Sequence, residues 1–153
     1  MIETGQIAPD FTLPADGGGD VTLSALRPSA VVVYFYPKAD TSGCTKQAIA
    51  FTEQLSAFEE AGAKIVGISK DPVKKLDKFR DKHSLGVHLL SDEDSDVCET
   101  WGTWVEKQMY GKKYMGIERS TFLIDGDGKI VEIWRKVKVP GHVETVLEAV
   151  KAL

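Results

Sequence analysis

Two uninterrupted apolar runs dominate the hydrophobic pattern of the chain. Residues 30–37 (AVVVYFYP) are apolar and rich in β-branched side chains, without the alternation of a half-exposed strand. This pattern predicts a strand that is covered on both faces. Residues 64–69 (KIVGIS) predict a second buried strand, and residues 87–92 (VHLLSD) predict a short third one. We expect the core of the protein to form around these strands.

Helical spacing separates these strands. Between residues 44 and 60, apolar side chains recur at spacings of three and four, which predicts one helix with a single buried stripe made of Ala48, Phe51, Leu55 and Phe58. Asp71 and Pro72 open a second predicted helix that runs to about residue 83. Residues 94–102 (DSDVCETWG) predict a short helix, and residues 142–153 predict a last one.

A hairpin is predicted at each end of this series. Residues 10–23 (DFTLPADGGGDVTL) alternate apolar and polar positions around a three-glycine turn, and we expect this hairpin to cover one edge of the sheet. Residues 119–135 (RSTFLIDGDGKIVEIWR) predict two strands joined by a tight turn. Residues 104–116 show no clear period. Strands that alternate with helices and end in a hairpin indicate one α/β domain spanning residues 1–153.

Composition and charge narrow the class of function. The 153 residues are 42% hydrophobic and 27% charged, with a net charge of -4, which is ordinary for a globular protein. Lys and Arg are spread along the chain, so nucleic acid is not an expected partner. The first residues, MIETGQIAPDF, lack the apolar core of a signal peptide, and no apolar run reaches the ~20 residues of a membrane span. We therefore expect a cytoplasmic protein with no membrane contact, whose two cysteines stay reduced.

Cys44 lies at a junction that favours a reactive sulfur. It follows the strand ending at Tyr36-Pro37 and a short loop, and it begins an amphipathic helix. Unpaired backbone N–H groups converge at such a helix start and favour an anion. Together with a cation, a helix start can lower the pKa of a thiol from its ordinary value of about 8.5. We therefore interpret Cys44 as a nucleophile, the alternative being a small buried packing residue.

A resemblance to a known family supports the same sulfur. The segment PKADTSGC (residues 37–44) matches the P-x-x-x-T-x-x-C signature of peroxiredoxins. Together with SDEDSDVCETWG and RSTFLIDGDGKI, it makes nearly the whole chain resemble the bacterioferritin-comigratory-protein, or PrxQ, subfamily. The resemblance implies a thioredoxin-like fold with an N-terminal β-hairpin extension, and it implies that Cys44 is the peroxidatic cysteine.

The same resemblance implies an activity. The expected enzyme is a thiol-dependent peroxidase that reduces hydrogen peroxide and organic hydroperoxides through a sulfenic acid on Cys44. A thiol reductant, which would be thioredoxin, glutaredoxin or a small thiol, then regenerates Cys44. No metal, haem, flavin or other cofactor is expected to take part. The expected oligomeric state is a monomer or a weak dimer.

Three further residues carry over from the family signature. Thr41 would orient the peroxide through its hydroxyl, and Pro37 would limit water around the sulfur. Arg119 would hold the thiolate and the peroxide oxygens with its planar donor fork. Taken without the motif, Thr41 reads as a helix cap, Pro37 as a strand terminator and Arg119 as a surface ion-pair partner. The backbone N–H groups of Gly43 and Cys44 would complete the anion site.

The second cysteine leaves two alternatives open. Many PrxQ proteins carry a resolving cysteine five residues after the peroxidatic one, but this chain has Ile49 there. The other known location corresponds to residues 72–84, which hold no cysteine. Only Cys98 remains, on a predicted helix that should bury one side. It is either an inert buried thiol or a resolving cysteine that reaches Cys44 after local unfolding.

Other signals point to structure rather than chemistry. Asp92, Asp94 and Asp96 imitate the start of a calcium loop but lack its later residues, so we interpret them as a solvated turn and a helix N-terminus. The three histidines, His83, His88 and His142, lack metal-ligand spacing, and no metal site is predicted. The aromatic residues Trp101, Trp104 and Tyr110 are expected to pack in the core or at a pocket rim.

Three other functions remain to be separated from the peroxidase. A thiol-disulfide oxidoreductase on the same fold would normally show C-x-x-C, but Gln47 stands three residues after Cys44. A Cys-His hydrolase would need one of the histidines beside Cys44. A binding module without enzymatic activity would have no chemical use for the grouped Pro37, Thr41, Cys44 and Arg119.

Overall fold

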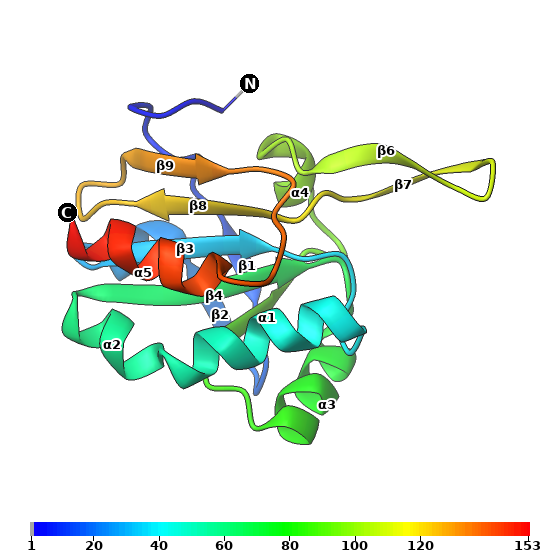
Figure 1. The fold of residues 1–153 in the computed structure, drawn as a ribbon, viewed down its shortest axis with the longest axis horizontal. Coiled ribbons are helices and arrows are strands. Elements are labelled where there is room, and N and C mark those ends of the chain that lie inside the picture. The colour runs from blue at the N-terminus through cyan, green and yellow to red at the C-terminus, as the bar shows by residue number, and fades with distance from the viewer. Residues whose placement is uncertain (1) are drawn as a thin grey trace.

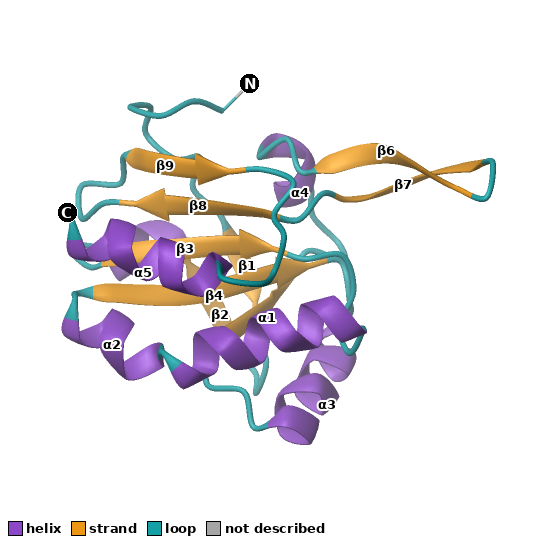
Figure 2. Ribbon diagram, in the orientation of Figure 1, coloured by secondary structure: helices purple, strands orange, loops and turns teal. Residues whose placement is uncertain are grey.

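A five-stranded mixed sheet forms the centre of the computed structural model, which describes residues 2–153 (Figures 1 and 2). The strand order is β5-β4-β3-β8-β9. Strands β3 (Ala30–Phe35), β4 (Ala63–Ser69) and β5 (His88–Ser91) are parallel, whereas β8 (Ser120–Ile124) and β9 (Ile130–Trp134) run antiparallel. The predicted α/β class is confirmed, as are the two buried strands and the short third strand, and the structure adds that their pairing is parallel.

Helices cover one face of this sheet, with α1, α2 and α5 in front of the strands in Figure 1. The helices packed there are α1 (Ser42–Glu53), α2 (Leu55–Glu60), α3 (Val73–His83) and α5 (His142–Lys151). Every residue of β3 is buried, and its alternate residues Val32 and Tyr34 enter this first core. Cys44 belongs to the same core.

The opposite face has a core of its own. It is covered by β1 (Thr12–Pro14), β2 (Asp20–Thr22), the 3-10 helix η1 (Leu23–Leu26) and the short helix α4 (Val97–Thr100). The other residues of β3, among them Val33 and Phe35, point into this second core, because successive side chains of a strand face opposite sides. Cys98 and Trp101 are fully buried there. The sheet thus lies between the two cysteines.

The N-terminal hairpin takes its predicted place at a sheet edge. β1 and β2 pair antiparallel, and a bridge joins Ala15 to Leu90 on the edge strand β5. The Asp16 backbone N–H donates to the Leu89 carbonyl oxygen, while the Asp16 carboxylate accepts the Leu89 N–H and pairs with Arg80 of α3. The hairpin therefore protects the outer edge of β5 from pairing with another chain.

The helix after Cys44 is broken, so the predicted single helix over residues 44–60 is wrong. Gln54 leaves the helical conformation, with φ -100° and ψ 6°, and separates α1 from α2. Two residues earlier, the Thr52 hydroxyl donates to the Ala48 carbonyl oxygen and accepts the backbone N–H of Gly86. A threonine that bonds back onto its own helix bends that helix. The predicted apolar stripe survives the bend, and Phe58 of α2 is still fully buried.

Residues 104–117 form a hairpin that the sequence pattern did not predict. β6 (Trp104–Met109) pairs with β7 (Lys112–Ile117), and Figure 1 shows the pair projecting from the body of the protein. Tyr110 and Gly111 form the two-residue turn with φ of 52° and 78°, as expected for a type I′ turn. Tyr110 is 98% exposed, so it does not pack in the core.

Asp92 serves the helix N-terminus as predicted, but it is not solvated. It is fully buried rather than part of a solvated turn, and its carboxylate accepts the backbone N–H groups of Val97 and Cys98 at 3.2 and 2.8 Å. Lys70 lies 3.3 Å from the same carboxylate and balances its charge. Asp92 therefore satisfies the free N–H groups at the start of α4. None of the described helices is long and apolar enough to cross a membrane.

Candidate active site

Cys44 is the third residue of α1, directly behind the carboxyl end of β3. Its side chain is only 2% exposed. The chain passes from β3 through residues 36–41 into α1, so the sulfur lies in the first turn of the helix, where backbone N–H groups lack helical partners. The Arg119 guanidinium donates from Nη2 to the Cys44 Sγ at 3.2 Å. The Cys44 thiol therefore lies beside both the Arg119 guanidinium and the N-terminus of α1.

Arg119 reaches the site from the loop between β7 and β8. Its second terminal nitrogen, Nη1, donates to Gln47 Oε1 at 2.6 Å. A Cβ built on Gly43 would come within 3.2 Å of Arg119 Nη2, so the absence of a side chain at Gly43 leaves room for the guanidinium. The guanidinium is thus held by Cys44 and Gln47, which lie three positions apart on α1, and Gly43 leaves it room.

Gln47 is a site residue that sequence reasoning missed. It follows Cys44 by three positions, so both side chains lie on the same face of α1, and it is fully buried. One feature of the sequence could have identified it. Gln47 is a polar residue that directly precedes Ala48, a member of the apolar stripe of the predicted helix. Its amide Nε2 has no hydrogen-bond partner among the residues described.

Thr41 and Pro37 belong to the segment that joins β3 to α1, ahead of Cys44 in the chain. Thr41 is the N-cap residue of α1 but makes no side-chain cap, because its hydroxyl donates to the Lys38 carbonyl oxygen at 2.7 Å. In this arrangement the hydroxyl is not bonded to the sulfur. Pro37 is half-buried, two residues beyond the end of β3. The structure therefore joins Arg119 to Cys44 by direct contact and places Thr41 and Pro37 in the adjoining loop.

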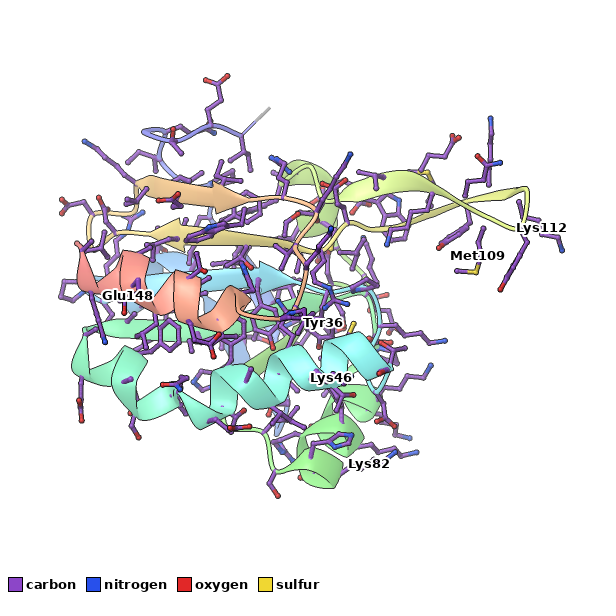
Figure 3. All side chains as sticks on the ribbon, viewed as in Figure 1. Tyr36, Lys46, Lys82, Met109, Lys112 and Glu148 are labelled. Atoms are coloured by element: carbon purple, nitrogen blue, oxygen red, sulfur yellow. The ribbon has the colours of Figure 1, made fainter. Side chains whose placement is uncertain are left out.

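Two carboxylates fix this loop. The buried Asp71 carboxylate accepts the Ala39 backbone N–H at 2.7 Å and the Ser69 hydroxyl at 2.8 Å. Asp40, at φ 62°, accepts hydrogen bonds from His83 and Lys82 of α3, both at 2.9 Å, and these bonds lower the pKa of Asp40. Figure 3 labels Lys82 on α3 below Lys46 of α1. The loop before Cys44 is thus tied to β4 and to α3.

The surroundings of the sulfur are largely apolar. Tyr34 and Tyr36 are buried in the first core, and burial raises the pKa of both hydroxyls, so both stay neutral. Lys107 on β6 also experiences the charges of this site. Burial lowers the pKa of Lys107, and the positive charge of Arg119 lowers it further.

Cys98 lies in a different environment from Cys44. It is fully buried in the second core, on the far side of the sheet. Burial raises the pKa of the Cys98 thiol, and the neighbouring Asp92 carboxylate raises it further. Both cysteines are free thiols. In this conformation the body of the sheet separates the two sulfurs.

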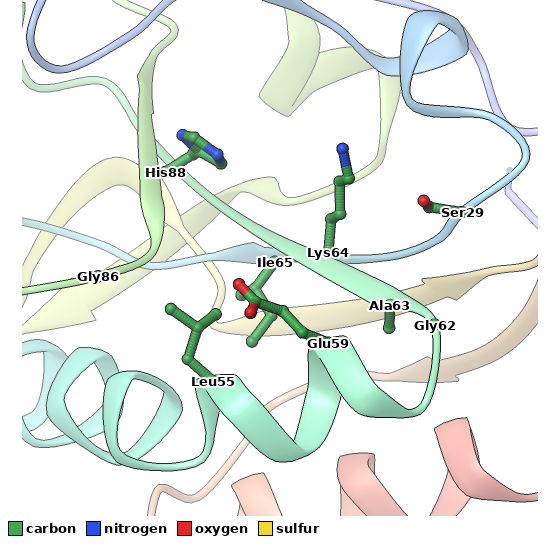
Figure 4. A pocket seen from close by; sticks show the side chains of 9 residues that line it. All are labelled: Ser29, Leu55, Glu59, Gly62, Ala63, Lys64, Ile65, Gly86 and His88. Atoms are coloured by element: carbon green, nitrogen blue, oxygen red, sulfur yellow. The ribbon is translucent and has the colours of Figure 1, made fainter.

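None of the three histidines forms a hydrogen bond with Cys44. His83 bonds to Asp40, and His142 Nε2 lies 2.8 Å from the Thr121 hydroxyl in a buried site. His88 lines a pocket of about 310 Å³ (Figure 4) at the amino ends of β4 and β5, the opposite end of the parallel strands from Cys44. This arrangement supplies no imidazole base for a Cys-His hydrolase. Residues 2–153 contain no cluster of three or more His, Cys, Asp or Glu able to hold a metal ion.

Comparisons with known proteins identify the family. The profile of the AhpC/TSA family matches residues 4–133. The peroxiredoxin Bcp of Bacillus subtilis is 46% identical over 150 residues, which cover 98% of this chain and 96% of the relative. Escherichia coli peroxiredoxin Bcp is 45% identical over the same coverage.

Solved structures give the same result. The bacterioferritin comigratory protein of Xanthomonas campestris, described for its alkyl peroxide reduction activity, has a TM-score of 0.88 at 46% identity and covers 93% of this chain and 90% of its own. A Cys-to-Ser variant of Xylella fastidiosa PrxQ has a TM-score of 0.94 at 39% identity, with coverages of 99% and 97%. The resemblance read from three sequence segments is confirmed. The chain therefore belongs to the AhpC/TSA family and, within it, to the bacterioferritin-comigratory-protein, or PrxQ, group of peroxiredoxins, which are thiol peroxidases.

Proposed function

We propose that Cys44 is the peroxidatic cysteine of this thiol peroxidase and that Arg119 activates it. The observation that carries the proposal is the 3.2 Å contact between Arg119 Nη2 and the Cys44 sulfur at the start of α1. A fixed guanidinium and free backbone N–H groups both favour the thiolate over the thiol. The thiolate is the nucleophile that peroxide reduction requires.

The reaction is a two-electron oxidation of the sulfur. The Cys44 thiolate attacks the terminal oxygen of a hydroperoxide, an S–O bond forms and the O–O bond breaks. The departing oxygen takes a proton and leaves as water or as an alcohol, and Cys44 becomes a sulfenic acid. Arg119 stabilises the negative charge that spreads over sulfur and oxygen in the transition state. Hydrogen peroxide and organic hydroperoxides are the proposed substrates.

The loop before Cys44 shapes the peroxide site. Pro37 covers one side of the sulfur and reduces its contact with water. The Thr41 hydroxyl, which donates to Lys38 in the resting arrangement, turns to the peroxide when substrate binds. The backbone N–H groups of Gly43 and Cys44 complete the anion site. The ties of this loop to Asp71 and to α3 support such preorganisation, because they fix its backbone before substrate arrives.

An external thiol completes the cycle. Position 49 holds isoleucine, and Cys98 lies across the sheet in a fully buried site. We therefore assign Cys98 to packing rather than to resolution. The sulfenic acid on Cys44 condenses with a thiol of thioredoxin, glutaredoxin or a small molecule, and a second thiol releases the reduced enzyme. The enzyme acts without a cofactor, as a single domain in the cytoplasm and as a monomer or weak dimer.

Peroxide consumption by the purified protein tests this proposal. Wild type, Cys44→Ser and Cys98→Ser are each given hydrogen peroxide or tert-butyl hydroperoxide with a dithiol reductant, and the remaining peroxide is measured. We expect Cys44→Ser to lose turnover and Cys98→Ser to keep most of it. Equal peroxide consumption by wild type and Cys44→Ser would show that Cys44 is not the nucleophile.

A further inference from the structure

The β6–β7 hairpin gathers most of the large apolar side chains that the protein leaves exposed. Within residues 2–153, four of these seven side chains lie on the hairpin, namely Met109, Tyr110, Tyr114 and Met115. A groove of about 450 Å³ lies here, lined by Met109, Tyr110, Lys112, Lys113 and Tyr114. Gathered apolar surface of this kind marks a contact with a partner, and tyrosine and methionine are typical of such contacts.

One face of the hairpin carries both apolar and basic side chains. Cross-strand partners point to the same face of a sheet, and the register pairs Lys107 with Tyr114 and Met109 with Lys112. Because side chains alternate along a strand, these two pairs share one face and Met115 points to the other. We call the face made of Lys107, Met109, Lys112 and Tyr114 the basic face.

The positive charge of this surface is not neutralised. Among the described residues, no carboxylate lies within 4.0 Å of Lys107 or Lys112. Within the same residues, this also holds for Lys136 and Lys138, which are exposed in the segment after β9. The whole chain has a net charge of -4. A local positive patch on a protein that is negative overall favours an acidic partner.

The basic face leads to the active site. Besides burial, the charges of Arg119 and Cys44 act on the pKa of Lys107, so this side chain lies close to both. β7 ends two residues before Arg119. The Val137 backbone N–H donates to the Arg119 carbonyl oxygen at 2.9 Å, which holds residues 136–138 beside the same arginine. A partner seated on this face can therefore reach the site of Cys44.

We propose that the basic face and the adjoining Lys136 and Lys138 form the docking surface for an acidic protein dithiol, which reduces Cys44 after each turnover. Carboxylates of the partner meet the lysines, and its apolar side chains cover Met109 and Tyr114. Redox partners form small, transient interfaces, which one hairpin and one loop can supply. A lipid surface would need only the hairpin tip, whereas a face that continues to the active site suits a partner that brings a thiol. The inference rests on the proposed function, since it takes Cys44 to cycle through a sulfenic acid.

Docking serves a defined exchange of bonds. The Cys44 side chain is only 2% exposed, so a partner thiol must be held against the site to reach the sulfur. One partner thiol attacks the sulfenic sulfur, an S–S bond forms, and the oxygen leaves as water. The second partner thiol attacks its own half of this mixed disulfide, Cys44 leaves as a thiol, and the partner becomes a disulfide.

Steady-state kinetics with two reductants test the proposal. Hydrogen peroxide reduction is followed with an acidic bacterial thioredoxin, its reductase and NADPH, and separately with dithiothreitol, which needs no docking surface. The double variant Met109→Ser/Tyr114→Ser removes the apolar part of the surface, and Lys112→Glu/Lys138→Glu reverses two charges. We expect each to lower kcat/KM for thioredoxin about tenfold or more and to leave turnover with dithiothreitol unchanged.

Two matched controls make the same chemical changes elsewhere. Met115→Ser acts on the opposite face of the same hairpin. The double variant Lys64→Glu/Lys129→Glu reverses two charges at the end of the sheet opposite to Cys44. Both should keep the wild-type kcat/KM for thioredoxin.

Three outcomes decide between the alternatives. Wild-type kcat/KM for thioredoxin in both docking variants would overturn the proposal, as would an equal loss of turnover with dithiothreitol. Binding to phosphatidylserine vesicles that both variants lose, with unchanged thioredoxin kinetics, would assign the surface to lipid instead. NMR titration of the isotope-labelled protein with thioredoxin is independent of activity: amide shifts in residues 104–117 of a protein that reduces no peroxide would refute the proposed function and leave the docking surface in place.

Discussion

Tyr34 of β3 lies directly against the backbone of Gly67 on the neighbouring strand β4. The two residues are partners in the parallel ladder, and a Cβ built on Gly67 would come within 2.6 Å of Tyr34 Cζ. The tyrosine ring also stacks on Phe51 of α1 at 4.7 Å and is fully buried. Glycine at position 67 therefore lets a bulky ring fill the space between the sheet and the helix that carries Cys44.

This contact predicts the effect of adding one methyl group. Gly67→Ala should lower the free energy of unfolding by about 1–3 kcal/mol, because the ring is held on both sides and cannot yield. Urea unfolding followed by tryptophan fluorescence measures the change. Gly116→Ala is the control, since the new methyl group there meets the flexible stem of Lys107 at 3.2 Å. Equal stabilities of Gly67→Ala and wild type would mean that the Tyr34 ring moves freely.

The geometry of the Arg119 fork predicts that charge alone cannot replace it. Arg119→Lys keeps a cation but cannot donate to both Cys44 and Gln47 from one planar group. We expect it to slow peroxide reduction by at least about tenfold while circular dichroism and the thermal unfolding temperature stay close to wild type. Stopped-flow measurement of the reaction with hydrogen peroxide tests this expectation. Wild-type rates in both Arg119→Lys and Arg119→Ala would assign the residue a purely structural role.

The separation of the two sulfurs predicts the fate of the oxidised enzyme. One equivalent of peroxide should leave Cys44 as a sulfenic acid that a dimedone probe traps, and excess peroxide should carry it to the sulfinic state. Mass spectrometry of a digest prepared without reductant should contain no Cys44–Cys98 peptide. Near-stoichiometric formation of that disulfide, with loss of thioredoxin-supported turnover in Cys98→Ser, would contradict the one-cysteine cycle and require α4 to unfold.

His142 predicts a pH dependence of stability. Burial lowers the pKa of His142 to about 4, and the charge of Arg119 contributes to the same shift. Between about pH 4 and 6.5, the unfolded chain therefore binds a proton that the folded protein does not. The stability linked to neutral His142 is complete above pH 6.5 and is lost as the pH falls toward 4.

Urea unfolding at two pH values measures this linkage. From pH 7 to pH 5, the free energy of unfolding of wild type should fall by about 2 kcal/mol from this group. His142→Gln keeps a polar side chain near Thr121 but has no group that titrates in this range, so its stability should change less. A fall of the same size in both proteins would assign the pH dependence to other residues.

Local sequence pattern was sufficient for the buried strands and for the position of Cys44. Strand β3 is predictable because both its faces are covered, so its residues are apolar without interruption. The β6–β7 hairpin is not predictable in this way, because its exposed strands bury few side chains and its Tyr110-Gly111 turn lacks the Asn or Asp that usually marks a type I′ turn. Figure 3 shows Met109 and Lys112 at the tip of this hairpin, away from the body.

The residues around Cys44 could not be predicted from local sequence pattern. Arg119 lies 75 positions away in the chain, and only the family resemblance connected the two residues before the structure placed them in contact. The burial of Gln47 and of Asp92 was missed for a common reason. A polar residue in a helix or a turn is usually solvated, and only the fold reveals that these two are buried with specific partners.

The sheet between the two cores gives the protein two independent thiol reporters. Cys44 lies in the first turn of α1 and belongs to the first core, so we expect it to become accessible when that turn opens. Cys98 belongs to the second core, so we expect it to become accessible when the packing of α4 against the sheet is lost. We expect pulsed thiol labelling of the reduced protein to distinguish fluctuations at the start of α1 from unfolding of the second core, without any added probe site.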